Sequence, residues 1–270
     1  MTGYAVIGFL TDYGTEDGFV GTCHAVMAGL APNARVIDVT HQVPPGDVRR
    51  GASVLADSAP WFPPSVLLAV VDPGVGTARR AIAVDAGPCV LVGPDNGLLS
   101  RTWEALGGVG RAVALAPHAG GRHGPSATFH GRDVFAPAAA RLATGTDLHA
   151  LGPRIDPASL VTLPPAVVRV LPGRVETEVL TVDRFGNLQL AAGPDDLRAA
   201  FGDEPPRALL LASGDVTRPV RRGRAFADVA PGEPVLLTDS AGRLAVAVNQ
   251  GSAATALGLA PGDAVRLSQR

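Results

Sequence analysis

The chain contains no lysine: all 23 of its basic residues are arginine. This absence excludes Schiff-base chemistry on a lysine amine and a phosphate-binding P-loop, which requires a lysine. Alanine, glycine, proline and arginine are all plentiful, so a genome-wide codon bias explains the missing lysines without any functional cause. The absence limits the possible chemistry but does not itself indicate a function.

Cysteines and long apolar runs are also scarce. The two cysteines, Cys23 and Cys89, are too few for a disulfide framework or a four-cysteine zinc site, which favours a reducing, cytoplasmic location. No apolar run approaches the roughly 18 residues of a membrane span, and no basic region precedes the first apolar stretch, so we expect neither a span nor a signal peptide. The net charge of −2 gives no electrostatic reason to expect nucleic acid or an acidic membrane as a partner.

Apolar residues make up 46% of the 270, enough for a globular protein with one or two buried cores. The first half alternates short apolar runs with helical patterns, which predicts an α/β domain with a mainly parallel sheet between helices. Strands are expected at Tyr4–Leu10, Ala34–Val39, Ser65–Val71, Ala81–Val84 and Cys89–Val92, and helices at Phe19–Leu30, 47–58, Asn96–Leu106 and Arg132–Ala143.

The second half has a different pattern. Prolines punctuate the stretch after Leu151, which predicts a linker. Short apolar strands separated by Gly/Pro/Asp loops follow, and this spacing predicts a smaller all-β domain, an antiparallel barrel or sandwich. The expected division is an α/β domain over residues 1–160, a linker over 161–172 and a barrel-like domain over 173–270.

Two aspartates follow predicted strands of the first domain. Asp12 comes after the first strand and Asp72 after the third, and glycines follow each of them. In an open parallel sheet, ligands bind outside the carboxyl ends of the strands, so both carboxylates are expected on one functional edge. Solvated Asp-Gly turns are the alternative, since such turns are common at protein surfaces.

His130 stands just before a predicted helix, where the helix N-terminus disfavours the imidazolium form. A neutral histidine beside a carboxylate can orient or deprotonate water, but its position alone favours a residue that serves only to begin the helix. His24 and His41 are not spaced as a zinc pair with a nearby ligand, and no metal site is expected. Cys23 falls on the apolar face of a predicted helix, which favours packing over nucleophilic chemistry.

In the second half, Asp183-Arg184-Phe185-Gly186-Asn187 is either a hairpin turn or a recognition loop. In the second interpretation, Asn187 and nearby backbone groups bond the edge of a heterocycle, because an amide supplies both a donor and an acceptor. Phe226 could supply a stacking surface, or could simply belong to the core.

Several segments occur in a familiar order: FLTDYGTEDGFVG, IDVTHQVPPGDVRRGA, VVDPGVGTARR, VGPDNGLLS, FHGRDVFAP, DRFGN and VNQGSA. Together they resemble the S-adenosylmethionine (SAM) hydroxide adenosyltransferase family, the adenosine-forming SAM hydrolases. Enzymes that make carbon–fluorine and carbon–chlorine bonds at the same substrate carbon are relatives of this family. The resemblance covers nearly the whole chain.

The resemblance implies a homotrimer whose sites lie between the N-terminal domain of one subunit and the C-terminal domain of the next. It also implies that water or hydroxide attacks the ribose 5′ carbon of SAM, with no cofactor, and that methionine leaves. The family's catalytic triad matches Asp72, Arg79 and His130, while Arg80 is expected to face solvent. The matched substrate-binding residues are Asp12 at the ribose, Asp17 and Ser240 at the amino-acid end, Asp183, Phe185 and Asn187 around adenine and methionine, and Phe226 stacking on adenine.

Two departures from the halogenating relatives favour water over halide. Those enzymes carry a serine where Gly131 stands here, and the fluorinating ones have an added loop after the third-strand region that this sequence lacks. Arginines that grip methionine and adenine in the fluorinating enzyme fall at Ala241 and Val248, which leaves the carboxylate contact undefined. A halide-using SAM 5′-halogenase and a non-catalytic adenosine or SAM-binding protein remain the alternatives.

Overall fold

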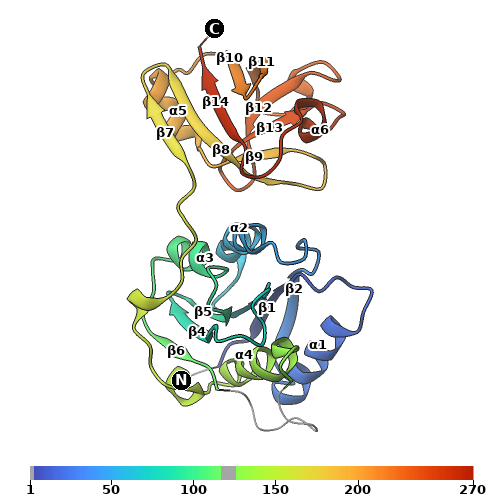
Figure 1. Cartoon of the computed structure of the whole chain (residues 1–270), viewed down its shortest axis with the longest axis vertical. Helices are drawn as coiled ribbons and strands as arrows, with labels where there is room; N and C mark the ends of the chain where they lie inside the picture. The colour runs from blue at the N-terminus through green and yellow to red at the C-terminus, as the bar shows by residue number, and fades with distance from the viewer. Residues whose placement is uncertain (1–2, 117–125, 270) are drawn as a thin grey trace. The chain divides into compact units, whose positions relative to one another are not determined.

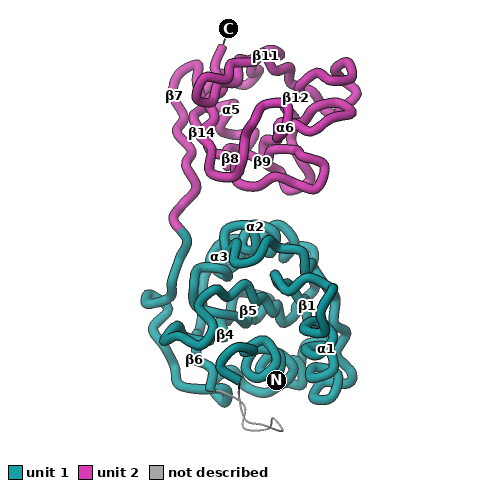
Figure 2. Tube along the Cα trace, turned by 45° about the vertical axis from the view of Figure 1, so that its right-hand side comes forward, with its two compact units in different colours: residues 1–163 teal, residues 164–270 magenta. Residues whose placement is uncertain are grey.

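The computed structural model describes residues 3–116 and 126–269. The chain divides into two compact units, residues 1–163 and 164–270, which differ in architecture (Figures 1 and 2). Among the helices of the described residues, none combines the length and hydropathy that crossing a bilayer requires.

The N-terminal unit is built on a six-stranded sheet with the order β2-β1-β3-β5-β4-β6. Neighbouring strands from β2 to β5 run parallel, while β4 pairs antiparallel with both β5 and β6. This confirms the predicted mainly parallel sheet. The strands are β1 (Val6–Thr11), β2 (Arg35–Thr40), β3 (Val66–Val70), β4 (Ala81–Ala86), β5 (Cys89–Pro94) and β6 (Ala112–Ala114).

Helices cover both faces of this sheet. On one face, α1 (Phe19–Leu30) and α4 (Ala136–Ala143) pack on a core that includes Val66 and Leu68 of β3. On the other, α2 (Val48–Ser58) and α3 (Ser100–Ala105) pack on a core that includes Leu67. Successive residues of β3 therefore enter opposite cores, which explains why this central strand is apolar throughout.

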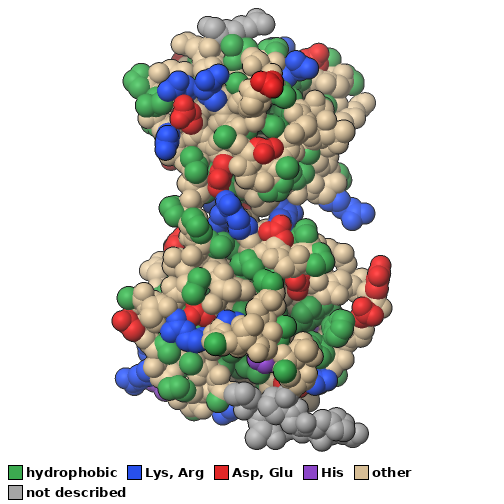
Figure 3. All heavy atoms as spheres, viewed as in Figure 1, with side chains coloured by type: hydrophobic (Ala, Val, Ile, Leu, Met, Phe, Trp, Pro, Cys, Tyr) green, Lys and Arg blue, Asp and Glu red, His purple; other side chains and the backbone are tan. Residues whose placement is uncertain are grey.

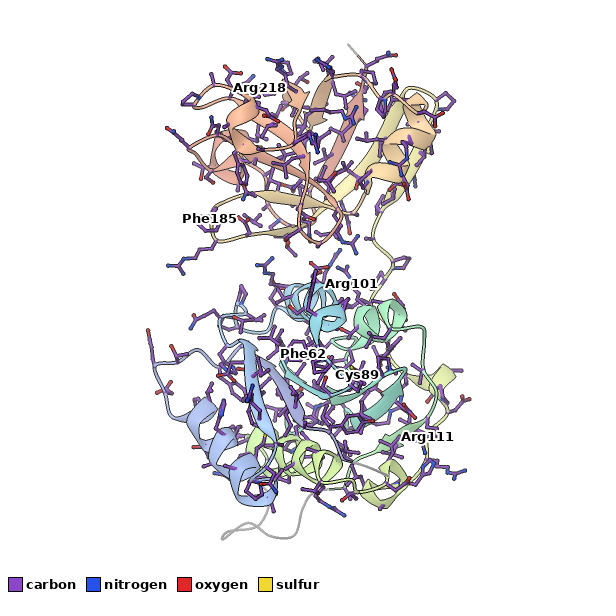
Figure 4. The ribbon with its side chains drawn as sticks, turned by 180° about the vertical axis from the view of Figure 1, so that it is seen from behind. Phe62, Cys89, Arg101, Arg111, Phe185 and Arg218 are labelled. Atoms are coloured by element: carbon purple, nitrogen blue, oxygen red, sulfur yellow. The ribbon has the colours of Figure 1, made fainter. Side chains whose placement is uncertain are left out.

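Both cysteines are buried, and neither forms a disulfide. Cys23 lies in the core between α1 and the sheet, and burial raises the pKa of its thiol to about 12. The predicted packing role of Cys23 is confirmed. Cys89 begins β5 in the interior of the unit (Figure 4).

The C-terminal unit is a closed β-barrel. Its sheet runs β14-β10-β11-β12-β13-β9-β8-β7, and a further pairing of β14 with β8 closes a ring of seven strands. The strands are β7 (Val168–Leu171), β8 (Arg174–Val182), β9 (Leu188–Leu190), β10 (Ala208–Ser213), β11 (Val216–Arg222), β12 (Pro234–Thr238), β13 (Leu244–Val248) and β14 (Ala264–Ser268), with helices α5 (Pro194–Phe201) and α6 (Ala253–Leu257). One pair, β11 with β12, is parallel. The segment 161–172, predicted as a linker, includes β7.

The expectation that Arg80 faces solvent is wrong. Its guanidinium bonds the Asp95 carboxylate at 2.7 Å and the Ser159 hydroxyl at 2.9 Å. The Asp95 carboxylate is buried and also accepts the Val161 N–H at 2.9 Å. Arg80 thus compensates a buried charge and fastens the end of the N-terminal unit to the sheet, a role that its position beside Arg79 does not reveal.

Replacing Arg80 by alanine should lower the free energy of unfolding of the N-terminal unit by about 2–3 kcal/mol, because the Asp95 carboxylate loses its cation. Arg111 is a matched control, since it forms an ion pair with Asp85 at 2.9 Å whose members are more exposed. Arg111→Ala should cost less than about 1 kcal/mol. Chemical denaturation of the full-length variants measures both values, and equal losses would contradict the assigned role of Arg80.

Candidate active site

A cavity of about 340 Å³ opens at the carboxyl ends of β1 and β3. Its lining includes Asp12 and Tyr13 after β1, Asp72 and Pro73 after β3, and His130 before α4. The two strands are parallel neighbours, so their following loops lie at the same edge of the sheet. The shared edge expected for Asp12 and Asp72 is confirmed.

Arg79 joins Asp72 to His130. Its Nε donates to Asp72 Oδ1 at 2.9 Å and its Nη2 donates to Asp72 Oδ2, so the contact has two prongs. The same Nη2 donates to His130 Nδ1 at 2.8 Å. The side chains of Arg79 and Asp72 are only 10% and 6% exposed. The structure therefore brings the three residues together, with the arginine in the middle.

Local backbone geometry explains how the loop after β3 returns an arginine to Asp72. Thr77 Oγ1 donates to Gly74 O at 2.7 Å, which closes the turn. Gly76 has φ +78°, a conformation that favours glycine, and a Cβ there would lie 2.7 Å from Ala127 O. This close approach places the loop against the segment that leads to His130.

The contact with Arg79 determines the proton arrangement on His130. A guanidinium has only donors, so the Nδ1 atom that faces it must carry a lone pair, and the neutral ring carries its proton on Nε2. Burial and the charge of Arg79 lower the pKa of His130, although Asp72 and Asp133 partly oppose the shift. The direction agrees with the sequence expectation, but burial and Arg79 are the leading causes.

His130 is held by a π-helical turn, η2 (Gly131–Phe135), that leads into α4. Asp133 in this turn accepts from Ser126 N at 2.8 Å and from the adjacent Arg132 Nε at 2.7 Å. The hydrogen bond from Arg132 is the largest cause of the lowered pKa of Asp133. Hydrogen bonds to Asp133 from neighbouring residues of the same segment therefore hold the turn that follows His130.

Asp12 and Tyr13 form a second part of the cavity. Asp12 Oδ2 accepts from Gly46 N at 2.8 Å, which orients the carboxylate. The Tyr13 ring lies 5.9 Å from the rings of both Phe19 and Phe129. Its hydroxyl lies against Gly131, where an added Cβ would come within 2.2 Å of the oxygen. The small residue after His130 is therefore required by Tyr13.

The predicted substrate-binding residues other than Asp12 divide between the two units. Asp17 is exposed in the loop before α1 and does not line the cavity. The others belong to the C-terminal unit, where Phe226 begins a short 3-10 turn and is 48% exposed, and Ser240 is exposed in the turn between β12 and β13. The predicted residues of the C-terminal unit are Asp183, Phe185, Asn187, Phe226 and Ser240.

The turn Asp183–Asn187 joins β8 to β9. Asp183 Oδ1 accepts the backbone N–H groups of Phe185 and Asn187, each at 2.9 Å, and Asp183 Oδ2 accepts from Asn187 Nδ2 at 2.7 Å. Gly186 allows the turn with φ +83°. Asp183 and the Asn187 amide N–H thus shape the turn, while Phe185 is 76% exposed and projects from it (Figure 4).

Comparison with known proteins assigns both units to one family. Residues 7–152 match the SAM hydroxide adenosyltransferase N-terminal domain, and residues 177–266 match the C-terminal domain. The chain belongs to the SAM hydroxide adenosyltransferase family. The family resemblance seen in the sequence is thereby confirmed.

Relatives within this family cover nearly the whole chain. A protein of Salinispora tropica named (R)-S-adenosyl-L-methionine hydrolase is 56% identical, over 97% of both chains. One of the same name from Thermus thermophilus is 46% identical, over 96% of this chain and 98% of its own. A fluorinase of an Actinoplanes species is 28% identical, over 92% of each. A crystal structure of an uncharacterized conserved protein from Thermotoga maritima has a TM-score of 0.89 at 37% identity, covering 97% of this chain and 100% of that one.

Several residues that line the cavity were not predicted from the sequence. Tyr13, Pro45, Gly46 and Thr128 line the cavity, and none was singled out. Tyr13 directly follows Asp12, so its position just after a predicted strand could have identified it as a cavity residue. Pro45 and Gly46 lie in a loop that lines the cavity and is bonded to Asp12 by a contact between distant parts of the chain, which no local pattern encodes.

Gly131→Ala should displace the Tyr13 ring and destabilise the N-terminal unit by about 1–3 kcal/mol, because the new methyl group occupies the position of the hydroxyl. Gly21→Ala is the matched control: a Cβ at this α1 position meets nothing within 4 Å. It should leave stability unchanged or raise it by up to about 1 kcal/mol. Thermal unfolding measures both, and a Gly131→Ala protein as stable as wild type would show that Tyr13 is not fixed.

Proposed function

We propose that this protein hydrolyses SAM to adenosine and L-methionine by attack of water on the ribose 5′ carbon. The observation that carries the proposal is the bonded set Asp72–Arg79–His130 at the cavity that Asp12 also lines. The names of the most similar relatives support it. The volume of about 340 Å³ falls within the range of about 300–1,000 Å³ typical of small-molecule sites.

The substrate contacts follow the family resemblance. Asp12, oriented by Gly46, accepts hydrogen bonds from the ribose hydroxyls. Asp17 and Ser240 contact the amino-acid end, and Phe226 stacks on adenine. The turn residues Asp183, Phe185 and Asn187 surround adenine and methionine, with the exposed Phe185 ring as an apolar surface. We further propose a cytoplasmic homotrimer in which the C-terminal unit of a neighbouring subunit supplies these contacts.

In this proposal the nucleophilic water lies between Asp72 and His130. The neutral imidazole donates its Nε2–H to the water oxygen, and a remaining lone pair of the Asp72 carboxylate accepts a water proton. These two bonds leave an oxygen lone pair for the 5′ carbon. Held in this way, the water need not be reoriented from bulk solvent before it reacts.

Charge then governs the reaction. The C5′–S bond breaks with its electron pair going to sulfur, and the new C5′–O bond uses an oxygen lone pair. One proton leaves the attacking oxygen and is accepted by Asp72. The leaving thioether is neutral, so no general acid is required. A site with little water favours this step, because the positive sulfonium loses its charge as the bond breaks.

Asp72→Asn should reduce kcat by about 10²- to 10⁴-fold, because the amide cannot take the proton, while adenosine binding persists. Asp85→Asn, in the more exposed ion pair with Arg111, is the control and should keep wild-type turnover. Chromatography of adenosine measures turnover, and calorimetry measures adenosine binding. In ¹⁸O water the label should enter adenosine and not methionine; wild-type turnover of Asp72→Asn, or label in methionine, would refute the mechanism.

The pH dependence should report His130. Burial and Arg79 lower the pKa of His130 below its ordinary value of about 6.5, so the neutral form persists below that pH and is lost as pH falls through the lowered pKa. The rate kcat/KM should therefore remain high down to below about pH 6.5 and decline at more acidic pH.

His130→Gln should lower the rate and remove the part of this acid decline that the imidazole causes, since an amide does not titrate. His149→Gln, a change at a half-buried histidine of the same unit outside the cavity, should leave the profile intact. An unchanged profile in His130→Gln would assign the acid decline to another group.

A further inference from the structure

Two histidines and an aspartate meet at the outer edge of the N-terminal sheet. His24 comes from α1, Asp38 from the edge strand β2, and His41 directly follows β2. Asp38 Oδ1 lies 2.9 Å from His24 Nε2 and 3.1 Å from His41 Nε2. The expectation that His24 and His41 have no nearby ligand is therefore wrong: the three candidate ligand atoms lie within 4.8 Å of one another.

The buried member of the group, His41, has one ring nitrogen without a hydrogen bond. Its side chain is 5% exposed, and its Nδ1 lies 2.9 Å from Thr11 Oγ1. Its Nε2 is buried with no hydrogen-bond partner, although Asp38 Oδ1 is near. The two atoms are therefore close without being aligned for a hydrogen bond, because the ring plane directs Nε2 to one side of Asp38 Oδ1. A metal ion placed to the side of these two atoms can bond to His41 Nε2 and Asp38 Oδ1 at once.

The surroundings of His41 suit a metal ligand. The Thr11 hydroxyl can accept the Nδ1–H, which fixes the tautomer that leaves the Nε2 lone pair for a metal. In that tautomer the lone pair and the Asp38 carboxylate repel each other unless a cation separates them. The side chains of Asp38 and His24 are 44% and 34% exposed, so an ion can enter from solvent.

Two imidazole nitrogens and one carboxylate oxygen are a donor set suited to zinc and similar divalent ions. At metal–ligand distances of about 2.0–2.2 Å, tetrahedral geometry separates neighbouring ligand atoms by about 3.3–3.5 Å. The observed contacts of 2.9 and 3.1 Å need to open by only a few tenths of an ångström. Since two of the three side chains are partly exposed, a water can complete the coordination.

We propose that His24, Asp38 and His41 form a binding site for a divalent transition-metal ion of the zinc class, outside the proposed catalytic cavity. The ion would also stabilise the turn after β1. Thr11 Oγ1 contacts His41 on one side and accepts Tyr13 N–H at 3.1 Å on the other. Gly14 N donates to His41 O at 2.8 Å, so the turn that holds Asp12 is bonded to the metal ligand.

Titration of untagged, metal-free full-length protein with ZnCl₂ in a calorimeter tests the site. One ion should bind per chain, and CoCl₂ should give the visible absorption of a site with nitrogen and oxygen ligands. Zinc at about 100 times its Kd should raise the folding equilibrium constant about 100-fold, seen as a higher Tm. His24→Ala and Asp38→Asn change partly exposed side chains and should each weaken binding at least tenfold.

The controls separate this site from incidental zinc binding by other histidines. His149→Gln should bind zinc as the wild type does, and so should the double variant His118→Gln/His123→Gln, whose two histidines lie outside the described residues. Circular dichroism of the metal-free variants checks that each is folded. Absence of zinc binding by the wild type, or zinc binding unaffected in folded His24→Ala and Asp38→Asn, would overturn the proposal.

Discussion

The contact of one guanidinium with a carboxylate and an imidazole is the constraint on which the proposed chemistry depends. Arg79 donates to both oxygens of Asp72 and to His130 Nδ1. Its positive charge compensates a carboxylate that is almost completely buried, and it opposes protonation of the neighbouring ring. One side chain therefore pairs with a buried carboxylate and favours the neutral form of the adjacent imidazole. A lysine could supply the charge but not the planar fork that reaches three acceptor atoms.

The fold positions this contact by close backbone approaches more than by long side chains. Gly76 lies against Ala127 O, and Gly131 lies against the Tyr13 hydroxyl. The first approach joins the loop after β3 to the segment before α4, and the second joins that segment to the turn after β1. In each unit, side chains of both charge signs appear on the surface that Figure 3 shows.

Much of the architecture could be predicted because periodicity reports burial. The helix Phe19–Leu30 was predicted with its observed bounds, and the parallel-strand rule placed Asp12 and Asp72 at one edge. Arg79 and His130 are 51 positions apart, and only the family resemblance joined them in advance. Arg80 was misjudged because its partner Asp95 directly follows β5, 15 positions further along the chain, and adjacent arginines look alike in a sequence. The parallel pair β11–β12 in the barrel was also missed, since short strands carry no signal of direction.

The turn after β1 lies between the cavity and the proposed metal site. Asp12 faces the cavity, while Thr11 and Gly14 on either side of it bond to His41. If the proposed ribose contact and metal site both hold, a cation that favours one geometry of this turn would change the affinity of the Asp12 carboxylate for ribose hydroxyls, and ribose binding would change the affinity for the cation by the same factor. The two sites share one short, partly buried segment, so the coupling requires no domain motion. The proposed metal site would then act on the catalytic cavity through the conformation of four consecutive residues.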